Sequence, residues 1–190
     1  SRENCNAIIE TASNTLIAGC KNGFIPNSVT SIGKNAFSDC KGLTSIAIPE
    51  SVTKIGDKAF YYCENLKSVS IPDSVISVGN NVFESCTKLS YNTYGDARYL
   101  GNTNNPYVVL VSVSSNNTTF YQVSQSTKII LEQAFLNCYM LTDITIPNSV
   151  SSIGAGAFNG CTALANIHVD EGNAYYCVGA EGALLNKDKT

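Results

Sequence analysis

The stretch IPESVTKIGDKAFYYCENLKSVSIP, residues 48–72, decides the fold because its pattern recurs along the chain. The copy before it, IPNSVTSIGKNAFSDCKGLTSIAIP, occupies residues 25–49, and a third copy begins at Ile71, so the period is 23 residues. The pattern returns from Lys128 and again from Ile146. One cysteine marks the same position in each copy: Cys40, Cys63, Cys86, Cys138 and Cys161. Self-similarity at this period predicts a solenoid of stacked coils.

Each unit reads I-P-x-S-V-x-x-I-G-x-x-A-F-x-x-C-x-x-L-x-x-I-x-I. The apolar positions of one unit are too few to offset the entropy lost when all its residues are ordered. A unit therefore depends on neighbours that bury both of its faces and complete its backbone hydrogen bonds.

The segment L-x-x-I-x-I-P alternates as a strand does and ends on a proline that lacks the N–H of a ladder. It predicts parallel strands near 45–48, 68–71, 143–146 and 166–169. The A-F-x-x-C stretch predicts a short helical or turn segment on the opposite side. One phenylalanine per copy is expected in a buried aromatic stack: Phe37, Phe60, Phe83, Phe135 and Phe158.

The stretch IGAGAFNG, residues 153–160, resembles a phosphate-binding loop when it is taken alone. In another copy of the repeat, Lys58 and Tyr62 occupy two of its three glycine positions. Neither residue would let the backbone approach a phosphate closely. The stretch is therefore expected to be a structural turn, in which Gly154 alone is constrained and the other two glycines are incidental.

The repeated stretches resemble the BspA-like leucine-rich repeat, and the resemblance covers residues 25–90 and 128–169. The segment YLGNTNNPYVVLV, residues 99–111, is similar to an insertion common in these proteins. The resemblance implies a right-handed superhelix with short parallel strands on a concave face. It also implies a secreted or cell-surface protein of bacteria or parasitic protists, with a role in adhesion to host proteins or other cells.

The repeats divide the chain into five segments. Two blocks of regular units are separated by a divergent, tyrosine-rich repeat, where Tyr107–Val113 and Thr118–Val123 predict a β-hairpin around SSNN. At the N-terminus, Ile8 and Ile9 are expected to face Leu16 and Ile17 in another hairpin. The C-terminal GALLNKDKT repeats the first arm of that hairpin, so its returning strand is expected after it. The boundaries are 1–24, 25–90, 91–127, 128–169 and a truncated unit at 170–190.

Five of the eight cysteines share one register position. Neighbouring coils would hold them about 4.8 Å apart with parallel Cα–Cβ vectors, which does not suit a disulfide. We expect buried free thiols there. Cys5 and Cys20 lie on opposite arms of the N-terminal hairpin, where a disulfide and two free thiols both remain open. Cys177 has no evident partner, and no C-x-x-C motif supports a zinc or redox site.

The net charge of −3 and the lack of clustered lysine or arginine argue against a nucleic-acid partner. No apolar run approaches the roughly 18 residues that span a bilayer, so no membrane insertion by this segment is expected. The chain is expected to be a monomer that needs no cofactor. His168 is the only histidine, and with Asp143 it is the sole support for an enzyme, since no nucleophile elbow or paired acids accompany them.

The outward positions of the strands carry small polar side chains, which suit an extended contact with a protein or a glycan. The tyrosines of the insertion are a second candidate contact, although they could equally pack over a joint of the solenoid. The leading hypothesis is a non-catalytic adhesion or recognition protein, and the alternative is a structural spacer in a long surface stalk. The candidate binding residues are Ser45, Lys67, Ser68, Ser70, Tyr91, Tyr99, Tyr107, Asp143, Thr145, Asn166 and His168.

Overall fold

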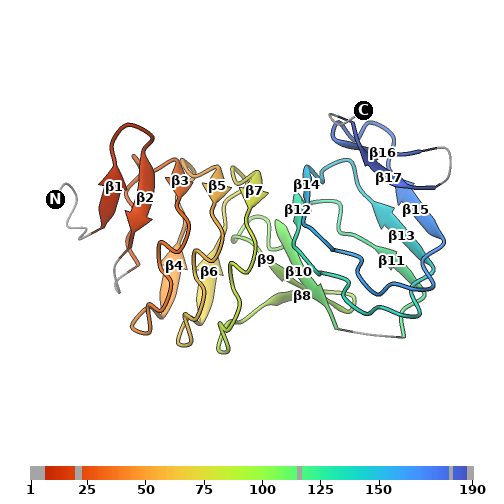
Figure 1. Cartoon of the computed structure of the whole chain (residues 1–190), viewed down its shortest axis with the longest axis horizontal. Helices are drawn as coiled ribbons and strands as arrows, with labels where there is room; N and C mark the ends of the chain where they lie inside the picture. Colours follow the sequence, from red (N-terminus) through yellow and green to blue (C-terminus); the bar gives the residue numbers. More distant parts are fainter. Residues whose placement is uncertain (1–6, 20–22, 115–116, 180–181, 188–190) are drawn as a thin grey trace. The chain divides into compact units, whose positions relative to one another are not determined.

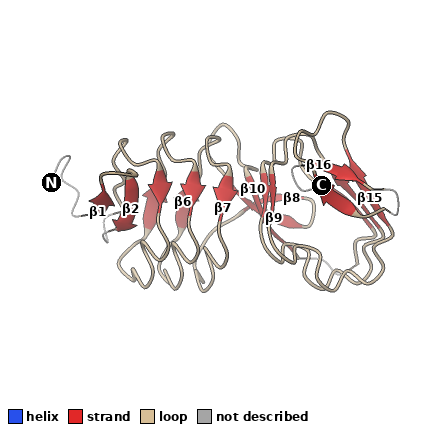
Figure 2. Ribbon diagram, turned by 45° about the horizontal axis from the view of Figure 1, so that its top comes forward, coloured by secondary structure: helices blue, strands red, loops and turns tan. Residues whose placement is uncertain are grey.

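A computed structural model describes residues 7–19, 23–114, 117–179 and 182–187. The chain is a β-solenoid, and every regular element in the described ranges is a strand, as Figure 2 shows. It divides into two compact units, each described below by itself. Unit 1 comprises residues 1–91 and 100–106, and unit 2 comprises residues 92–99 and 107–190. No helix among the described residues is long and apolar enough to cross a membrane.

The coils of unit 1 stack their parallel strands into two sheets, which Figure 1 shows one above the other. Ile32 pairs with Ile55 in one sheet, and Ile46 pairs with Val69 in the other, so both registers follow the repeat of 23 residues. The strands of the first sheet are β3 (Ser31–Ile32), β5 (Lys54–Ile55) and β7 (Ser77–Val78). Those of the second are β4 (Ser45–Ala47) and β6 (Ser68–Ser70), where the sequence predicted them.

The predicted N-terminal hairpin is present in unit 1. Strands β1 (Ile8–Glu10) and β2 (Thr15–Ala18) pair antiparallel, with Ile9 opposite Leu16. Strand β2 then pairs parallel with β3, so the hairpin extends the first sheet by two strands. Cys5 and Cys20 lie outside the described residues, so their possible disulfide stays a prediction.

Unit 2 repeats the two-sheet plan around the divergent insertion (Figure 1). One sheet has the order β14-β12-β10-β9-β8, and the other has the order β11-β13-β15. The first contains β8 (Asn92–Tyr94), β9 (Ala97–Leu100), β10 (Val109–Val113), β12 (Ile129–Ile130) and β14 (Ser152–Ile153). The second contains β11 (Phe120–Gln122), β13 (Asp143–Ile146) and β15 (Asn166–Val169).

The hairpin predicted for residues 107–123 is wrong. Strand β10 pairs parallel with β12, whereas β11 pairs parallel with β13 in the other sheet. Both segments therefore belong to one degenerate coil, because alternating β-rich runs look alike in a hairpin and in a solenoid coil. The antiparallel hairpin of the insertion lies earlier, between β8 and β9, with Thr93 opposite Arg98.

The C-terminal strand also pairs differently from the expectation. Strand β17 (Leu184–Asn186) lies antiparallel to β16 (Tyr176–Val178), which precedes it in the chain. The sequence had placed its partner after it. Asn173 anchors the start of this hairpin, since its buried amide donates to the carbonyl oxygens of Pro147 and Val150. Its side-chain oxygen accepts from the backbone N–H groups of Tyr175 and Tyr176.

The phenylalanine stack forms in each unit. In unit 1 the ring of Phe60 stacks on Phe37 at 5.1 Å and on Phe83 at 5.6 Å between centroids. In unit 2, Phe135 stacks on Phe158 at 5.2 Å. The described cysteines are all free, as expected, and the Cys63 and Cys86 thiols donate to the carbonyl oxygens of Phe37 and Phe60.

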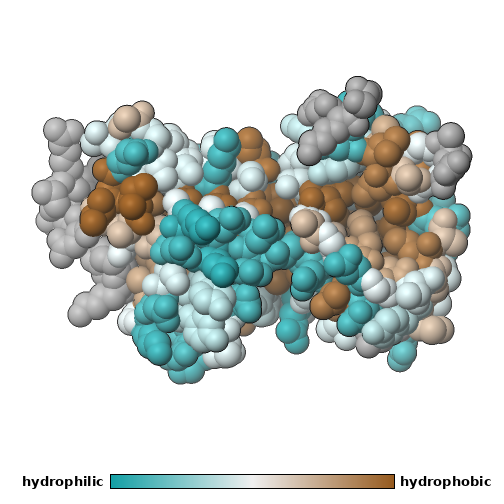
Figure 3. Space-filling view, in the orientation of Figure 1, coloured by the Kyte–Doolittle hydropathy of each residue, from teal (hydrophilic) through white to brown (hydrophobic). Residues whose placement is uncertain are grey.

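Core positions of the last regular coil are only half-buried, unlike their counterparts in preceding coils. Phe158, Leu164 and Ile167 pack against the core of unit 2 but keep part of their surface exposed. Figure 3 shows apolar surface in the part of the view where Figure 1 places β13 and β15.

The turn after each I-G pair contains two columns of residues in the left-handed region. Gly156 (φ 62°) shares its column with Asn35 (φ 58°) and Lys58 (φ 55°), and Gly160 (φ 77°) shares its column with Tyr62 (φ 56°). Every copy has a left-handed residue at both positions, a constraint that the sequence did not predict, but glycine itself is not required there because Lys58 and Tyr62 adopt the same conformation. Gly154 is constrained as predicted, since a Cβ atom on it would lie 2.2 Å from the backbone nitrogen of Glu132.

Replacing Gly156 by asparagine should change the free energy of unfolding by less than about 1 kcal/mol, because asparagine tolerates the left-handed region well. Asn35 and Asn81 already occupy this column. The Cβ atom would come within 2.5 Å of the Asn159 side-chain nitrogen, which belongs to a side chain that can move. Urea unfolding of the Gly156→Asn variant checks this, and a loss above about 2 kcal/mol would contradict the register assigned to the turn.

Alkaline pH should destabilise the fold through the buried thiols. Burial raises the pKa of Cys63 to about 12 and that of Cys86 to about 11. The folded chain therefore keeps both thiols protonated at a pH where the unfolded chain, with thiol pKa values of about 8.5, already loses the protons. Their stabilisation is complete below that pH and is lost as the pH rises toward the folded-state values.

Between pH 9 and 10 each thiol should lower the free energy of unfolding by about 1.4 kcal/mol per pH unit. Urea unfolding of wild type and Cys63→Ala across pH 7–10 measures the slope, which the variant should reduce whatever its stability at pH 7. An identical slope in both proteins would show that Cys63 does not carry the effect.

Candidate ligand-binding surface

The outward face of β11, β13 and β15 in unit 2 carries a greater variety of side chains than the corresponding face of β4 and β6 in unit 1. Phe120, Asp143 and Asn166 share one row across the three strands. The second row contains Gln122, Thr145 and His168. Of the residues between the two rows, Tyr121 and Ile144 are buried in the core and Ile167 is half-buried against it. Parallel pairing at the repeat spacing therefore brings six side chains from three coils onto one surface.

The side chains around Asp143 hold one another in place. The Asn166 amide donates to Asp143 Oδ1 at 2.8 Å, and His168 Nε2 lies 3.9 Å from the same oxygen. Hydrogen bonding from the Thr142 side chain and from Asn166 lowers the pKa of Asp143 below its usual value. The carboxylate is therefore ionised and oriented at neutral pH, where it can accept hydrogen bonds from a ligand.

The corresponding face of unit 1 is small and uniform. Ser45 pairs with Ser68 and Ala47 pairs with Ser70, and neither an aromatic ring nor a carboxylate stands in these rows. Lys67 precedes β6 and is exposed, as are Ser45 and Ser68. This face offers hydroxyl groups at regular spacing and little else with which to select a ligand.

The tyrosines of the insertion pack against one another instead of forming an open surface. Tyr99 is completely buried, and its hydroxyl lies 3.0 Å from that of Tyr121, which in turn donates to the Tyr94 carbonyl oxygen. Tyr107 is half-buried with its ring centroid 5.4 Å from that of Tyr99. Burial raises the pKa of both Tyr99 and Tyr121. The candidate role of Tyr99 in ligand contact is therefore wrong.

Tyr91 is also half-buried, and it belongs to unit 1. Among the five tyrosines Tyr91, Tyr94, Tyr99, Tyr107 and Tyr121, only Tyr94 is substantially exposed, at 43%. The insertion therefore serves first as a core for its own degenerate coil, in which the buried hydroxyl groups of Tyr99 and Tyr121 are paired by a hydrogen bond.

The residues considered for catalysis do not assemble a site. His168 and Asp143 are neighbours, but the His168 side chain is 61% exposed and faces outward. Within the described ranges, no group of three or more His, Cys, Asp or Glu residues could hold a metal ion. A proton-transfer pair in open solvent lacks the desolvated surroundings that make such groups effective.

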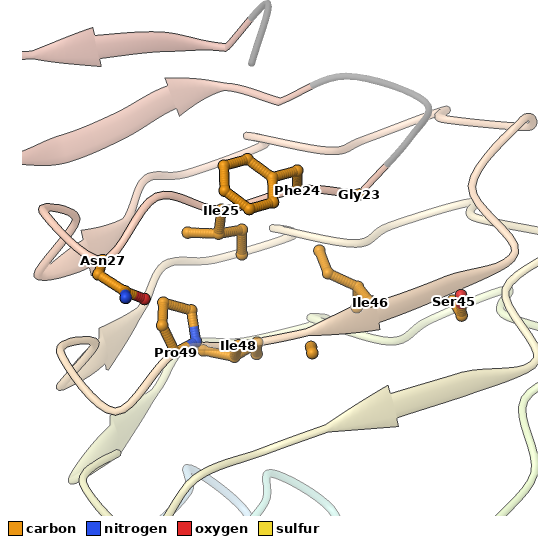
Figure 4. Close-up of a pocket in the computed structure, with 9 residues that line it drawn as sticks. Gly23, Phe24, Ile25, Asn27, Ser45, Ile46, Ile48 and Pro49 are labelled. Carbon is orange, nitrogen blue, oxygen red and sulfur yellow. The ribbon is translucent and has the colours of Figure 1, made fainter. Parts of the chain in front are cut away.

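A groove of about 460 Å³ lies along β4 in unit 1. Figure 4 shows Phe24 and Ile25 on the segment beside β4, and Ile46 and Ile48 at β4 and just after it. The lining of this groove contains no charged side chain. It offers apolar contact and backbone groups, with nothing that could perform acid–base chemistry.

Phe120 and Gln122 were not predicted from the sequence as members of the strand face. Both lie on β11, which the sequence pattern had suggested to be an arm of a hairpin, and Phe120 is 53% exposed. A signal was present, because Tyr121 precedes Ile144 by one repeat of 23 residues and pairs with it.

A comparison with protein-family models agrees with this architecture. The BspA type leucine rich repeat region matches residues 16–102 and 112–177 in six copies. A comparison with curated proteins gives no match.

Among solved structures, a leucine-rich repeat protein of T. pallidum has 22% sequence identity and a TM-score of 0.45 over 88% of this chain and 69% of that one. A leucine-rich cell surface protein of Faecalibacterium prausnitzii has 26% identity and a TM-score of 0.45 over 97% of this chain and 59% of that one. The pneumococcal vaccine antigen PcpA has 19% identity and a TM-score of 0.39 over 78% of this chain and 50% of that one. The chain thus spans 59% and 50% of the latter two proteins. On the extent of the repeat match, this chain belongs to the BspA-type leucine-rich repeat family.

Proposed function

We propose that this chain is a non-catalytic recognition module of a secreted or cell-surface protein. It binds an extracellular protein or glycan through the outward face of its strands. The observation that carries the proposal is the double row on β11, β13 and β15, where an exposed aromatic ring lies beside an oriented carboxylate. These side chains contribute little to the core, so their arrangement is available for contact with a ligand. The location outside the cell is proposed from the family.

A spacer function is the second candidate, and the packing of the tyrosines favours it. The insertion was one of two features that supported recognition, and Tyr99 and Tyr121 are at most 5% exposed. The small, uniform face of β4 and β6 also suits a segment that only extends a longer protein. Recognition therefore depends on the strand face of unit 2.

A binding panel separates the two functions. The immobilised chain is probed with extracellular-matrix proteins and with a glycan array, and wild type is compared with Phe120→Ser. Ile76→Ser is a matched control, because Ile76 and Phe120 are 52% and 53% exposed but only Phe120 lies on the strand face of unit 2. Recognition predicts a ligand that is lost with Phe120→Ser and kept with Ile76→Ser. If no ligand in the panel behaves in this way, the recognition function is refuted and the spacer function is retained.

A further inference from the structure

The strand face of unit 2 differs from that of unit 1 in one feature that points to a class of ligand. It combines an exposed aromatic ring with side chains that both donate and accept hydrogen bonds. Phe120 offers a flat apolar surface, Asp143 offers acceptors, and Asn166 and Gln122 offer amides. In the same two rows of unit 1 the residues are Ser45, Ser68, Ala47 and Ser70.

We propose that the double row formed by Phe120, Asp143, Asn166, Gln122, Thr145 and His168 is a binding subsite for a neutral sugar residue. This inference rests on the proposed recognition function and names its ligand class. A sugar ring has an apolar C–H face, which packs on Phe120, and a rim of neighbouring hydroxyl groups. Those hydroxyl groups donate to Asp143 and exchange hydrogen bonds with the amides of Asn166 and Gln122.

The charge of the face selects against other ligands. Asp143 is the one acidic side chain in the two rows, and segments 117–124, 142–147 and 165–170 contain no lysine or arginine. A phosphorylated or sulfated ligand would meet a carboxylate without a compensating lysine or arginine. A neutral, hydroxyl-rich ligand pays no such penalty.

The size of the face also fits a sugar better than a protein. Three strands at about 4.8 Å spacing and two rows about 7 Å apart give a footprint of about 10 Å by 7 Å. A stable protein interface covers roughly 800 Å² on each partner. The six side chains of the double row are therefore confined to an area that one or two sugar rings would cover.

The groups are pre-organised, which lowers the cost of binding a small ligand. The Asn166 amide holds Asp143 Oδ1 at 2.8 Å, and His168 Nε2 lies 3.9 Å from the same oxygen on the second row. The backbone beneath them is paired on both sides of β13, because β11 and β15 flank it. Little rotamer freedom remains for Asp143 to lose.

The test is a titration of the isotopically labelled full chain with the methyl glycosides of galactose, glucose, mannose, fucose and N-acetylglucosamine, followed by NMR. Binding should shift backbone amide signals at 120–122, 143–145 and 166–168, while signals at 45–47 and 68–70 stay unchanged. Phe120→Ser and Asp143→Ser should each weaken the binding at least tenfold. Both variants introduce the residue that unit 1 carries at the same register position, so they are expected to fold. Ile76→Ser should bind like wild type.

The sugar inference is overturned if none of the five glycosides shifts these signals, or if Phe120→Ser leaves the shifts intact. It is also overturned if the shifts appear at β4 and β6. The proposed function is tested separately, with matrix proteins from which the glycans have been removed. A deglycosylated protein that binds wild type but not Phe120→Ser would keep the recognition function and refute the sugar subsite.

Discussion

Replacing Phe60 by alanine should lower the free energy of unfolding by about 3–5 kcal/mol, the largest effect expected for a single substitution in this chain. Phe60 is fully buried at the centre of the stack in unit 1, with a parallel ring on each side. The two neighbouring rings belong to the coils on either side. The backbone of the Phe60 coil is hydrogen-bonded to the next coil, since the Phe60 N–H donates to the Val82 carbonyl oxygen. The coils cannot collapse into the cavity without breaking this hydrogen bond.

Urea unfolding followed by circular dichroism measures the loss. Ile76→Ala is the control, because Ile76 is 52% exposed and its truncation should cost less than about 1 kcal/mol. A cost for Phe60→Ala no larger than that of the control would mean that the rings do not form the core between coils.

Gly56→Ala should destabilise unit 1 by about 1–3 kcal/mol, which is the opposite of the usual stabilising effect of this substitution at a permissive site. A Cβ atom on Gly56 would lie 2.7 Å from the backbone nitrogen of Lys34 and 2.9 Å from the carbonyl carbon of Gly33. Both atoms belong to the backbone of the preceding coil, so the two coils would have to move apart. The Gly56 N–H also donates to the Ile32 carbonyl oxygen at 2.8 Å, a bond that such a movement would stretch.

Lys58→Gly is the matched control two residues later in the same turn. Lys58 has φ 55°, where glycine is unstrained, so this variant should be within about 1 kcal/mol of wild type. Thermal unfolding of both variants compares them directly. Equal destabilisation by the two substitutions would refute close stacking of coils as the reason for glycine at position 56.

Much of the fold follows from the sequence because the repeat states the register several times. The alternation of Ser45-Ile46-Ala47, followed 23 residues later by Ser68-Val69-Ser70, places both strands and both faces correctly. The phenylalanine stack follows from the same spacing. The left-handed columns were missed although Asn35 and Gly156 are residue types that favour a positive φ, because Lys58 in the same column gives no such signal.

The insertion was harder to predict for a physical reason. Strands β10 and β11 have the alternation of a hairpin, and pairing partners a whole repeat away leave no local mark in the sequence. This error hid Phe120 from the candidate surface. The sequence also could not decide whether Tyr99 is exposed or buried, because a tyrosine suits both a binding surface and a core that provides a partner for its hydroxyl group.

The most direct test of the account compares two adjacent residues of β11 by hydroxyl-radical footprinting with tandem mass spectrometry. The binding face requires Phe120 to point outward and Tyr121 inward, and their exposed fractions are 53% and 5%. A slip of one residue in the strand would exchange the two faces. We predict rapid oxidation of Phe120 and protection of Tyr121 in the folded chain, with protection lost on unfolding. Oxidation of Tyr121 as fast as that of Phe120, or protection of Phe120, would contradict both the degenerate coil and the surface built on it.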